Sequence, residues 1–113
     1  MGRNILSDLV LKQQQFSRMV PLLLTYIHGL GFDISFGEAW RTPEQAALYA
    51  ARHVGIKHSL HCDRMAVDLN IWHNGELITT PEPVAAYWES IGGSAGLRFG
   101  DPAHFSLAYG GRK

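Results

Sequence analysis

The 113-residue chain is 46% apolar and 18% charged, which fits one globular domain over residues 1–113. Its ten basic and ten acidic residues balance, and a formal net charge of zero argues against nucleic acid or an anionic membrane surface as a partner. The single cysteine, Cys62, excludes an intrachain disulfide, and no apolar run approaches the roughly 20 residues of a membrane-spanning helix. Polar residues interrupt the N-terminal apolar ones, so we expect synthesis in the cytoplasm without a signal peptide.

The first half of the chain predicts a long helix, a strand and a second helix. Apolar residues at helical spacing predict a helix from Ile5 to Leu30, in which Pro21 indicates a kink or a second helix that starts after Ser17. Alternation at period two predicts a strand from Asp33 to Trp40. Thr42-Pro43-Glu44-Gln45 has the pattern of a capped helix start, so a helix is expected to run to about Arg52.

The second half predicts three more strands and a short helix. Met65 to Trp72 alternates as a strand, and Asn74-Gly75 is a hairpin signal that predicts an antiparallel return over residues 76–79. Residues 81–91 predict a helix that ends at two glycines, a glycine-rich loop follows, and residues 104–109 predict a last strand. The expected class is α+β, with a small antiparallel sheet backed by helices.

Three side chains form a candidate metal site. Asp68 and His104 each lie on a predicted strand, on the face opposite the large apolar residues, and His61 lies in the loop that enters the strand of Asp68. Two imidazoles and one carboxylate suit a catalytic zinc ion whose fourth position is left to water. Spacing alone leaves a second interpretation open, in which both histidines are structural and Asp68 is an ordinary hydrogen-bond partner.

Two further side chains could complete an active site. Asp101, three residues before His104, could move a proton between the attacking water and a leaving amine, although an Asp-Pro pair also commonly starts a turn. Arg41 follows the predicted strand that ends at Trp40, where a guanidinium could bind a substrate carboxylate or stabilise an oxyanion. A solvated surface arginine is the alternative for this position.

Three blocks, in order, carry a resemblance to a known family. Ser59-Leu60-His61 through Ala66-Val67-Asp68-Leu69 resembles the S-x-H-x-x-G-x-A-x-D-[LIV] signature of the D-alanyl-D-alanine carboxypeptidase and VanY-type peptidoglycan peptidases. The stretch from Asp101 to Phe105 resembles their [DE]-x-x-H-F motif. Residues 36–45 resemble their [YW]-R-[ST]-x-x-x-Q stretch, with spacing to the glutamine one residue shorter. The chain is most similar to the single-domain phage endolysins of this group, many of them L-alanyl-D-glutamate endopeptidases.

The resemblance implies a hedgehog/DD-peptidase-like fold and assigns roles to the candidate residues. It implies zinc on His61, Asp68 and His104, Asp101 as general acid/base, and Arg41 as the electrostatic stabiliser. Ser59 would lie near the metal, and His58 could contact substrate. Two departures stand out: the signature glycine is replaced by Arg64, and residues 93–97 lack the tryptophan expected before the last motif.

The expected function is a zinc metallopeptidase that hydrolyses the peptidoglycan stem peptide, at the L-alanyl-D-glutamate bond, as a phage or prophage endolysin causing host lysis. We expect a monomer that is made in the bacterial host cytoplasm and reaches periplasmic peptidoglycan after holin-type release or delivery in a phage particle. Two alternatives remain open at this point. One is a D-alanyl-D-alanine carboxypeptidase, and the other is a non-catalytic zinc-binding module that binds the cell wall.

Overall fold

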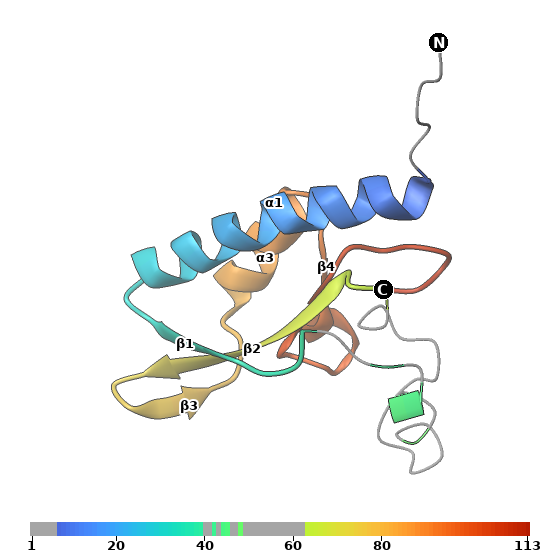
Figure 1. The fold of residues 1–113 in the computed structure, drawn as a ribbon. Helices are drawn as coiled ribbons and strands as arrows, with labels where there is room; N and C mark the ends of the chain where they lie inside the picture. Colours follow the sequence, from blue (N-terminus) through green and yellow to red (C-terminus); the bar gives the residue numbers. More distant parts are fainter. Residues whose placement is uncertain (1–6, 40–41, 43, 46–47, 49–62) are drawn as a thin grey trace.

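A computed structural model describes residues 7–39, 42, 44–45, 48 and 63–113. They form an α+β domain in which α1 (Asp8–Gly29) and α3 (Glu82–Ser90) pack on one face of a small antiparallel sheet (Figure 1). The expected fold class is therefore confirmed. No helix among the described residues is long and apolar enough to cross a membrane.

Helix α1 is one continuous helix with an apolar side turned to the core. The hydroxyl of Ser7 caps its start by accepting a hydrogen bond from the main-chain N–H of Val10 at 3.2 Å. The helix continues through Pro21 to Gly29, so the alternative of a second helix after Ser17 is wrong. Packing explains the continuity: the residues buried at helical spacing lie on both sides of the proline, and they are Phe16, Met19, Leu23 and Ile27.

The sheet is organised around one long strand. Its five strands are β1 (Asp33–Phe36), β2 (Ala66–His73), β3 (Glu76–Ile78), β4 (Ser94–Ala95) and β5 (His104–Ser106). The strand order is β1-β2-β5-β4, and β3 also pairs with β2. Strand β2 therefore pairs with three antiparallel partners, β1 on one edge and both β5 and β3 on the other.

The alternation of β2 divides the sheet into two faces as predicted. Met65, Val67, Leu69 and Ile71 are at most 4% exposed and face the helices, whereas Asp68 lies on the opposite face and is half-buried. The predicted hairpin is also confirmed, because β3 returns directly after Asn74-Gly75. Both turn residues have positive φ, 52° and 80°, as the tight two-residue turn requires.

Helix α3 is held to the sheet by a buried tryptophan. Trp88 is fully buried, and its Nε1–H donates to the main-chain oxygens of Ser94 at 3.1 Å and Ser106 at 3.0 Å. Its ring makes edge-on contacts with Phe16 and Phe105. One side chain thus joins α1, α3, β4 and β5.

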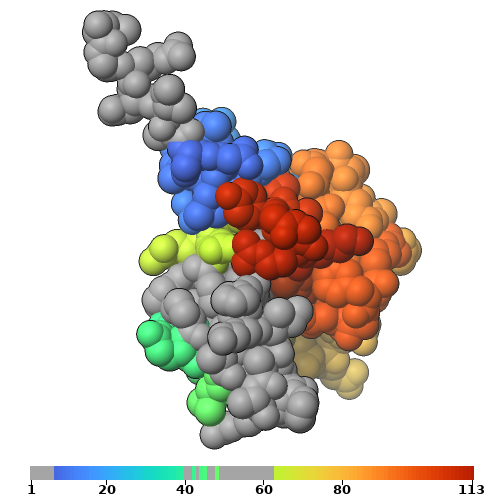
Figure 2. All heavy atoms as spheres, turned by 90° about the vertical axis from the view of Figure 1, so that its right-hand side faces the viewer, coloured from blue at the N-terminus to red at the C-terminus, as the bar shows by residue number. Residues whose placement is uncertain are grey.

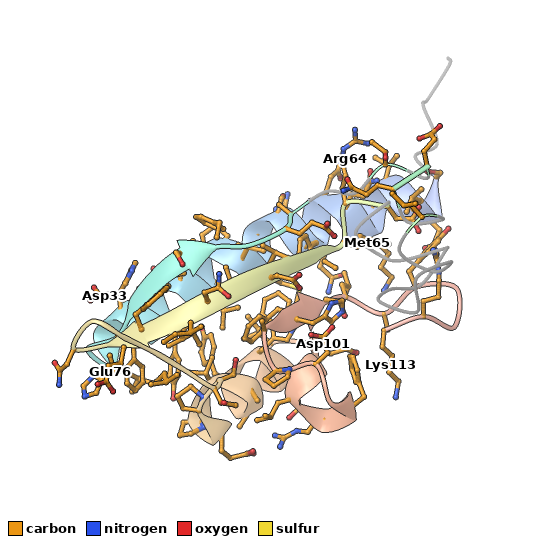
Figure 3. The ribbon with its side chains drawn as sticks, turned by 90° about the horizontal axis from the view of Figure 1, so that it is seen from below. Asp33, Arg64, Met65, Glu76, Asp101 and Lys113 are labelled. Carbon is orange, nitrogen blue, oxygen red and sulfur yellow. The ribbon has the colours of Figure 1, made fainter. Side chains whose placement is uncertain are left out.

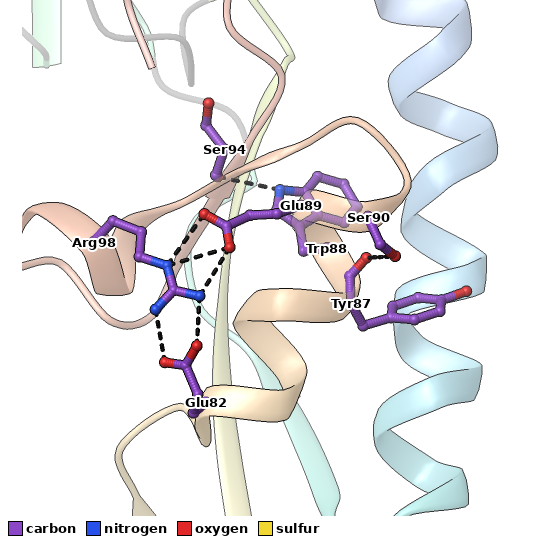
Figure 4. A network of polar contacts seen from close by, with 7 residues as sticks. All are labelled: Glu82, Tyr87, Trp88, Glu89, Ser90, Ser94 and Arg98. Atoms are coloured by element: carbon purple, nitrogen blue, oxygen red, sulfur yellow. Dashed lines mark hydrogen bonds and ion pairs between the residues drawn. The ribbon is translucent and has the colours of Figure 1, made fainter.

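An ion-pair network, the Arg98 network of Figure 4, fastens a short 3-10 helix, η1 (Gly96–Phe99), to α3. Arg98 donates two hydrogen bonds of 2.6 Å to Glu82 and three of 2.8–3.2 Å to Glu89. These hydrogen bonds hold the pKa of both carboxyl groups below the ordinary value and raise the pKa of the guanidinium. The prediction of a plain glycine-rich loop here is wrong, since residues 94–99 form β4 and η1.

The C-terminal segment folds back against the start of β2. Tyr109 and Arg112 form an isolated bridge, and Arg112 pairs with Asp63 at 2.5 Å. The side chain of Gln13 on α1 donates to the main-chain oxygen of Asp63 at 2.8 Å. Figure 2 shows the resulting arrangement, in which the C-terminal residues (red) lie beside the first part of α1 (blue). This brings Lys113 to the candidate site.

The remaining element predictions differ from the structure mainly at their ends. The first helix begins at Asp8, β1 ends at Phe36 and β5 ends at Ser106, so these elements are shorter than predicted. Thr42 caps a helix start as expected, since its hydroxyl accepts a hydrogen bond from the main-chain N–H of Gln45 at 3.0 Å. The end of that helix, near Arg52, lies outside the described residues.

Candidate functional site

Asp68 and His104 lie directly opposite each other on β2 and β5. They are paired residues of the antiparallel register, so their side chains lie on the same face of the sheet. Oδ1 of Asp68 is 3.8 Å from Nδ1 of His104. The structure therefore brings these two predicted site residues together, although they lie 36 residues apart in the sequence.

A β-bulge on the other edge of β2 helps to orient Asp68. The N–H of Gly37 donates to the main-chain oxygen of Asp68 at 2.8 Å, and the N–H of Asp68 donates to the main-chain oxygen of Glu38 at 2.7 Å. Gly37 and Glu38 thus both lie opposite Asp68, and an extra residue of this kind bends a strand and redirects side chains. A Cβ at Gly37 would lie 3.1 Å from Cβ of Asp68, so glycine permits this close approach.

The His104 ring is fixed by two contacts and presents Nδ1 to the carboxylates. Its Nε2 lies 3.2 Å from the main-chain oxygen of Lys113, and Phe99 packs edge-on with a centroid distance of 5.7 Å. Since that oxygen can only accept, Nε2 carries a proton and donates it. Nδ1 of the neutral ring is then a lone pair, as a metal ligand must be, and metal-binding histidines commonly donate their other N–H to a carbonyl.

Asp101 approaches the same ring nitrogen from the turn before β5. Its Oδ2 is 3.9 Å from Nδ1 of His104, and its main-chain oxygen accepts a hydrogen bond from the N–H of His104 at 3.0 Å. The two carboxylates lie at similar distances from Nδ1 of His104 but differ in solvent exposure. The side chain of Asp68 is 28% exposed and that of Asp101 is 60% exposed. Figure 3 shows Asp101 beside β2, away from the hairpin end that carries Asp33 and Glu76. Asp101 can therefore meet water and substrate.

The turn that carries Asp101 packs tightly on Gly96. The N–H of Asp101 donates to the main-chain oxygen of Gly96 at 2.9 Å. A Cβ at Gly96 would clash with the main-chain oxygen of Asp101 and lie 2.7 Å from Cβ of His104. Gly96 is thus a positioning residue that the sequence reasoning missed. The sequence indication for it was a glycine five residues before Asp101, which did not stand out because several other glycines lie nearby.

Asp68 and His104 fit two positions of a zinc site. Oxygen and nitrogen ligands about 2.0–2.1 Å from a tetrahedral zinc lie about 3.4 Å from each other, so the observed 3.8 Å needs a small closure. An imidazole lone pair flanked by two carboxylates is a set of donor atoms that suits a metal cation. Within the described part of the chain, no three side chains form a complete metal-binding group.

Four predicted site residues lie outside the described residues, namely Arg41, His58, Ser59 and His61. The structure does describe Arg64, which stands at the signature glycine position. Arg64 has φ of 58°, in the left-handed region that glycine adopts without steric cost. The backbone at the entry to β2 therefore has a conformation that glycine adopts most readily.

The chain was compared with families and with proteins of known function. No family model matches it, and no curated protein matches it at a significant level.

Proposed function

We propose that this protein is a zinc metallopeptidase that hydrolyses the stem peptide of bacterial peptidoglycan, at the L-alanyl-D-glutamate bond. The observation that carries the proposal is the convergence of Asp68, Asp101 and His104, with Nδ1 of the imidazole 3.8 and 3.9 Å from the two carboxylates. These residues occupy the motif positions at which the resembling peptidases have two metal ligands and a general acid/base.

Each residue has a distinct role in the proposed reaction. Zinc held by His61, Asp68 and His104 would polarise the scissile carbonyl and acidify the attacking water. Asp101, the more exposed carboxylate, takes the proton from that water and returns it to the departing amine. Lys113 keeps the imidazole of His104 oriented through its main-chain oxygen. Arg41 offsets the charge that develops on the carbonyl oxygen.

The backbone at Arg64 supports the same assignment. The resembling signature has glycine at this position, and a positive φ is the conformational reason for a glycine. A chain that turns here with φ of 58° can follow the loop geometry of the signature even with an arginine. Arg64 thus departs from the motif in its side chain, whereas its backbone conformation remains compatible with the loop of the signature.

The biological setting follows from the same resemblance. We propose a phage or prophage endolysin that acts as a monomer and causes host lysis. It would be made in the bacterial cytoplasm and reach periplasmic peptidoglycan after holin-type release or delivery in a phage particle. A formal net charge of zero is compatible with an uncharged or mixed-charge peptide substrate.

The test is mass spectrometry of purified peptidoglycan after digestion. The protein is used as purified, after chelation, with zinc restored, and as the isosteric variant Asp101→Asn. Asp33→Asn is the matched control, because Asp33 lies on the same face of the sheet as Asp68 but at its far end (Figure 3). We expect new amino termini at D-glutamate with the wild type and the control, and their loss with chelator and with Asp101→Asn.

The other outcomes separate the alternatives. Release of terminal D-alanine without internal cleavage would identify a D-alanyl-D-alanine carboxypeptidase. Failure of a folded, zinc-loaded sample to cleave several wall types would contradict the enzymatic proposal and leave a non-catalytic cell-wall-binding module.

A further inference from the structure

A pocket lies where two strands part along one edge of β2. Strand β5 pairs with β2 up to Asp68, and β3 pairs with the same edge from Ile71 onward. Between these pairings, a pocket of about 300 Å³ is lined by Leu69 and Asn70 of β2, by residues 77–80 of β3 and the segment after it, and by residues 101–103 of the turn before β5. This volume is at the lower end of the range of small-molecule sites and fits a short peptide segment.

The pocket walls are braced against each other. The hydroxyl of Thr80, at the β3 side, donates a 2.5 Å hydrogen bond to the main-chain oxygen of Pro102 at the β5 side. The N–H of Leu69 donates to the main-chain oxygen of Ala103 at 2.9 Å. These hydrogen bonds fix the position of the β3 side relative to the β5 side, so the pocket is formed before any ligand enters.

The pocket lining has one charge and several neutral hydrogen-bonding groups. Asp101 is the ionisable lining residue, and the described lining includes no cation. Asn70 and Thr79 offer an amide and a hydroxyl to peptide groups, and the other lining residues are mainly aliphatic. A ligand carboxylate would meet the negative charge of Asp101 without a compensating partner in this lining, whereas a small neutral residue would meet apolar walls.

Asp101 joins this pocket to the candidate site. The same carboxylate lines the pocket and lies 3.9 Å from Nδ1 of His104. A peptide residue in the pocket would therefore be adjacent to the bond at which Asp101 transfers a proton. Of the two residues that flank the proposed bond, alanine is small and neutral and D-glutamate carries a carboxylate.

We propose that this pocket binds the residue on the acyl side of the cleaved bond and selects a small uncharged side chain there. The proposal rests on the proposed function and deepens it, since it fixes the direction in which the stem peptide lies across the site. The alanine side lies between β3 and β5, and the glutamate side extends away from this pocket.

The experiment combines a variant that adds a positive charge to the pocket with a binding measurement. Synthetic stem peptides carry alanine or aspartate on the acyl side of the bond, and kcat/KM is measured for wild type and for Thr79→Arg. Thr25→Arg is the matched control, because Thr25 is an exposed residue of α1. Independently, N-acetyl-L-alanine amide and N-acetyl-L-aspartate amide are titrated into zinc-loaded protein while the amide resonances of Asn70 and Thr79 are followed by NMR.

We expect wild type and Thr25→Arg to prefer alanine over aspartate by at least about tenfold, and Thr79→Arg to reduce that preference by about tenfold. A Thr79→Arg preference equal to that of the wild type would overturn the pocket assignment while leaving the proposed reaction intact. If no peptide is cleaved, the proposed function fails and the NMR arm decides: shifts at Asn70 and Thr79 with the alanine probe and not the aspartate probe support the pocket. Shifts with both probes, shifts only at other residues, or no shifts with either probe overturn it.

Discussion

Replacement of Gly96 by alanine tests how the candidate site is positioned. A Cβ at this residue would lie 2.7 Å from Cβ of His104 and closer still to the main-chain oxygen of Asp101. Ordinary contact begins at 3.4 Å, so His104 and the turn of Asp101 must move by about 0.7 Å or more. Overpacking of this kind destabilises a protein by about 1–3 kcal/mol. A shift of about 1 Å at reacting groups lowers a rate by about 100-fold.

The assays are urea unfolding, zinc affinity by competition with a chromophoric chelator, and peptidoglycan cleavage. Gly96→Ala is expected to lose both stability and zinc affinity. Gly29→Ala is the matched control: it lies at the end of α1, nothing lies within 4 Å of the point its new methyl group would occupy, and its stability should be unchanged or up to about 1 kcal/mol higher. If Gly96→Ala does not fold, Gly37→Ala is the milder variant, since its Cβ would lie 3.1 Å from Cβ of Asp68. Wild-type stability and zinc affinity in Gly96→Ala would refute the reasoning.

Three further predictions concern backbone conformation, acid stability and the buried indole. Arg64→Gly should be about 1 kcal/mol more stable than Arg64→Ala in urea unfolding, since both lack the side chain and only alanine retains the steric cost of φ 58°; equal stabilities would show that the position is unstrained. Because Arg98 lowers the pKa of Glu82 and Glu89 below the ordinary 4.5, their contribution to stability is present above pH 4.5 and is lost as pH falls through the lowered values. Arg98→Met should therefore melt below the wild type at pH 7 and approach it in acid, and a difference that stays constant with pH would contradict this. Trp88→Phe leaves two main-chain acceptors without their donor and should cost about 1–3 kcal/mol in urea unfolding; a smaller loss would mean that water replaces the indole.

Local patterns predicted much of the fold. Alternation along β2 depends on the pleat of a single strand, and Asn74-Gly75 supplies the positive φ angles of a tight turn, so both features follow from nearby residues. Pro21 was misleading for the opposite reason. Burial of the residues on both sides of it supports a continuous helix, and that tertiary contribution is not visible in local propensity.

The short elements before Asp101 could not be predicted locally. Strand β4 has two residues and exists because Ser94 and Ala95 pair with β5 and because Trp88 donates to the main-chain oxygen of Ser94. A pair of residues carries no periodic signal of its own. The Arg98 network likewise depends on two glutamates of α3 that the sequence places 9 and 16 residues away.

For the candidate site, the face on which each side chain lies was predictable, and the strand register and the supporting contacts were not. The alternation rule placed Asp68 and His104 on the face opposite the apolar residues, and only the structure shows that they are directly paired. The Gly37–Glu38 bulge and the contact of His104 with Lys113 arise from long-range pairing. They explain how the site is oriented, which residue type and spacing cannot specify.

The position of Asp68 between a bulge and β5 has a consequence for how the site would respond to the proposed metal ion. The N–H of Asp68 donates to the main-chain oxygen of Glu38 at 2.7 Å on one edge of β2, and the N–H of Leu69 donates to that of Ala103 at 2.9 Å on the other edge. Amides bonded within the centre of a sheet usually exchange with solvent through global unfolding. The strand that carries Asp68 should therefore be as ordered without metal as with it, and metal binding should need little conformational entropy from the sheet.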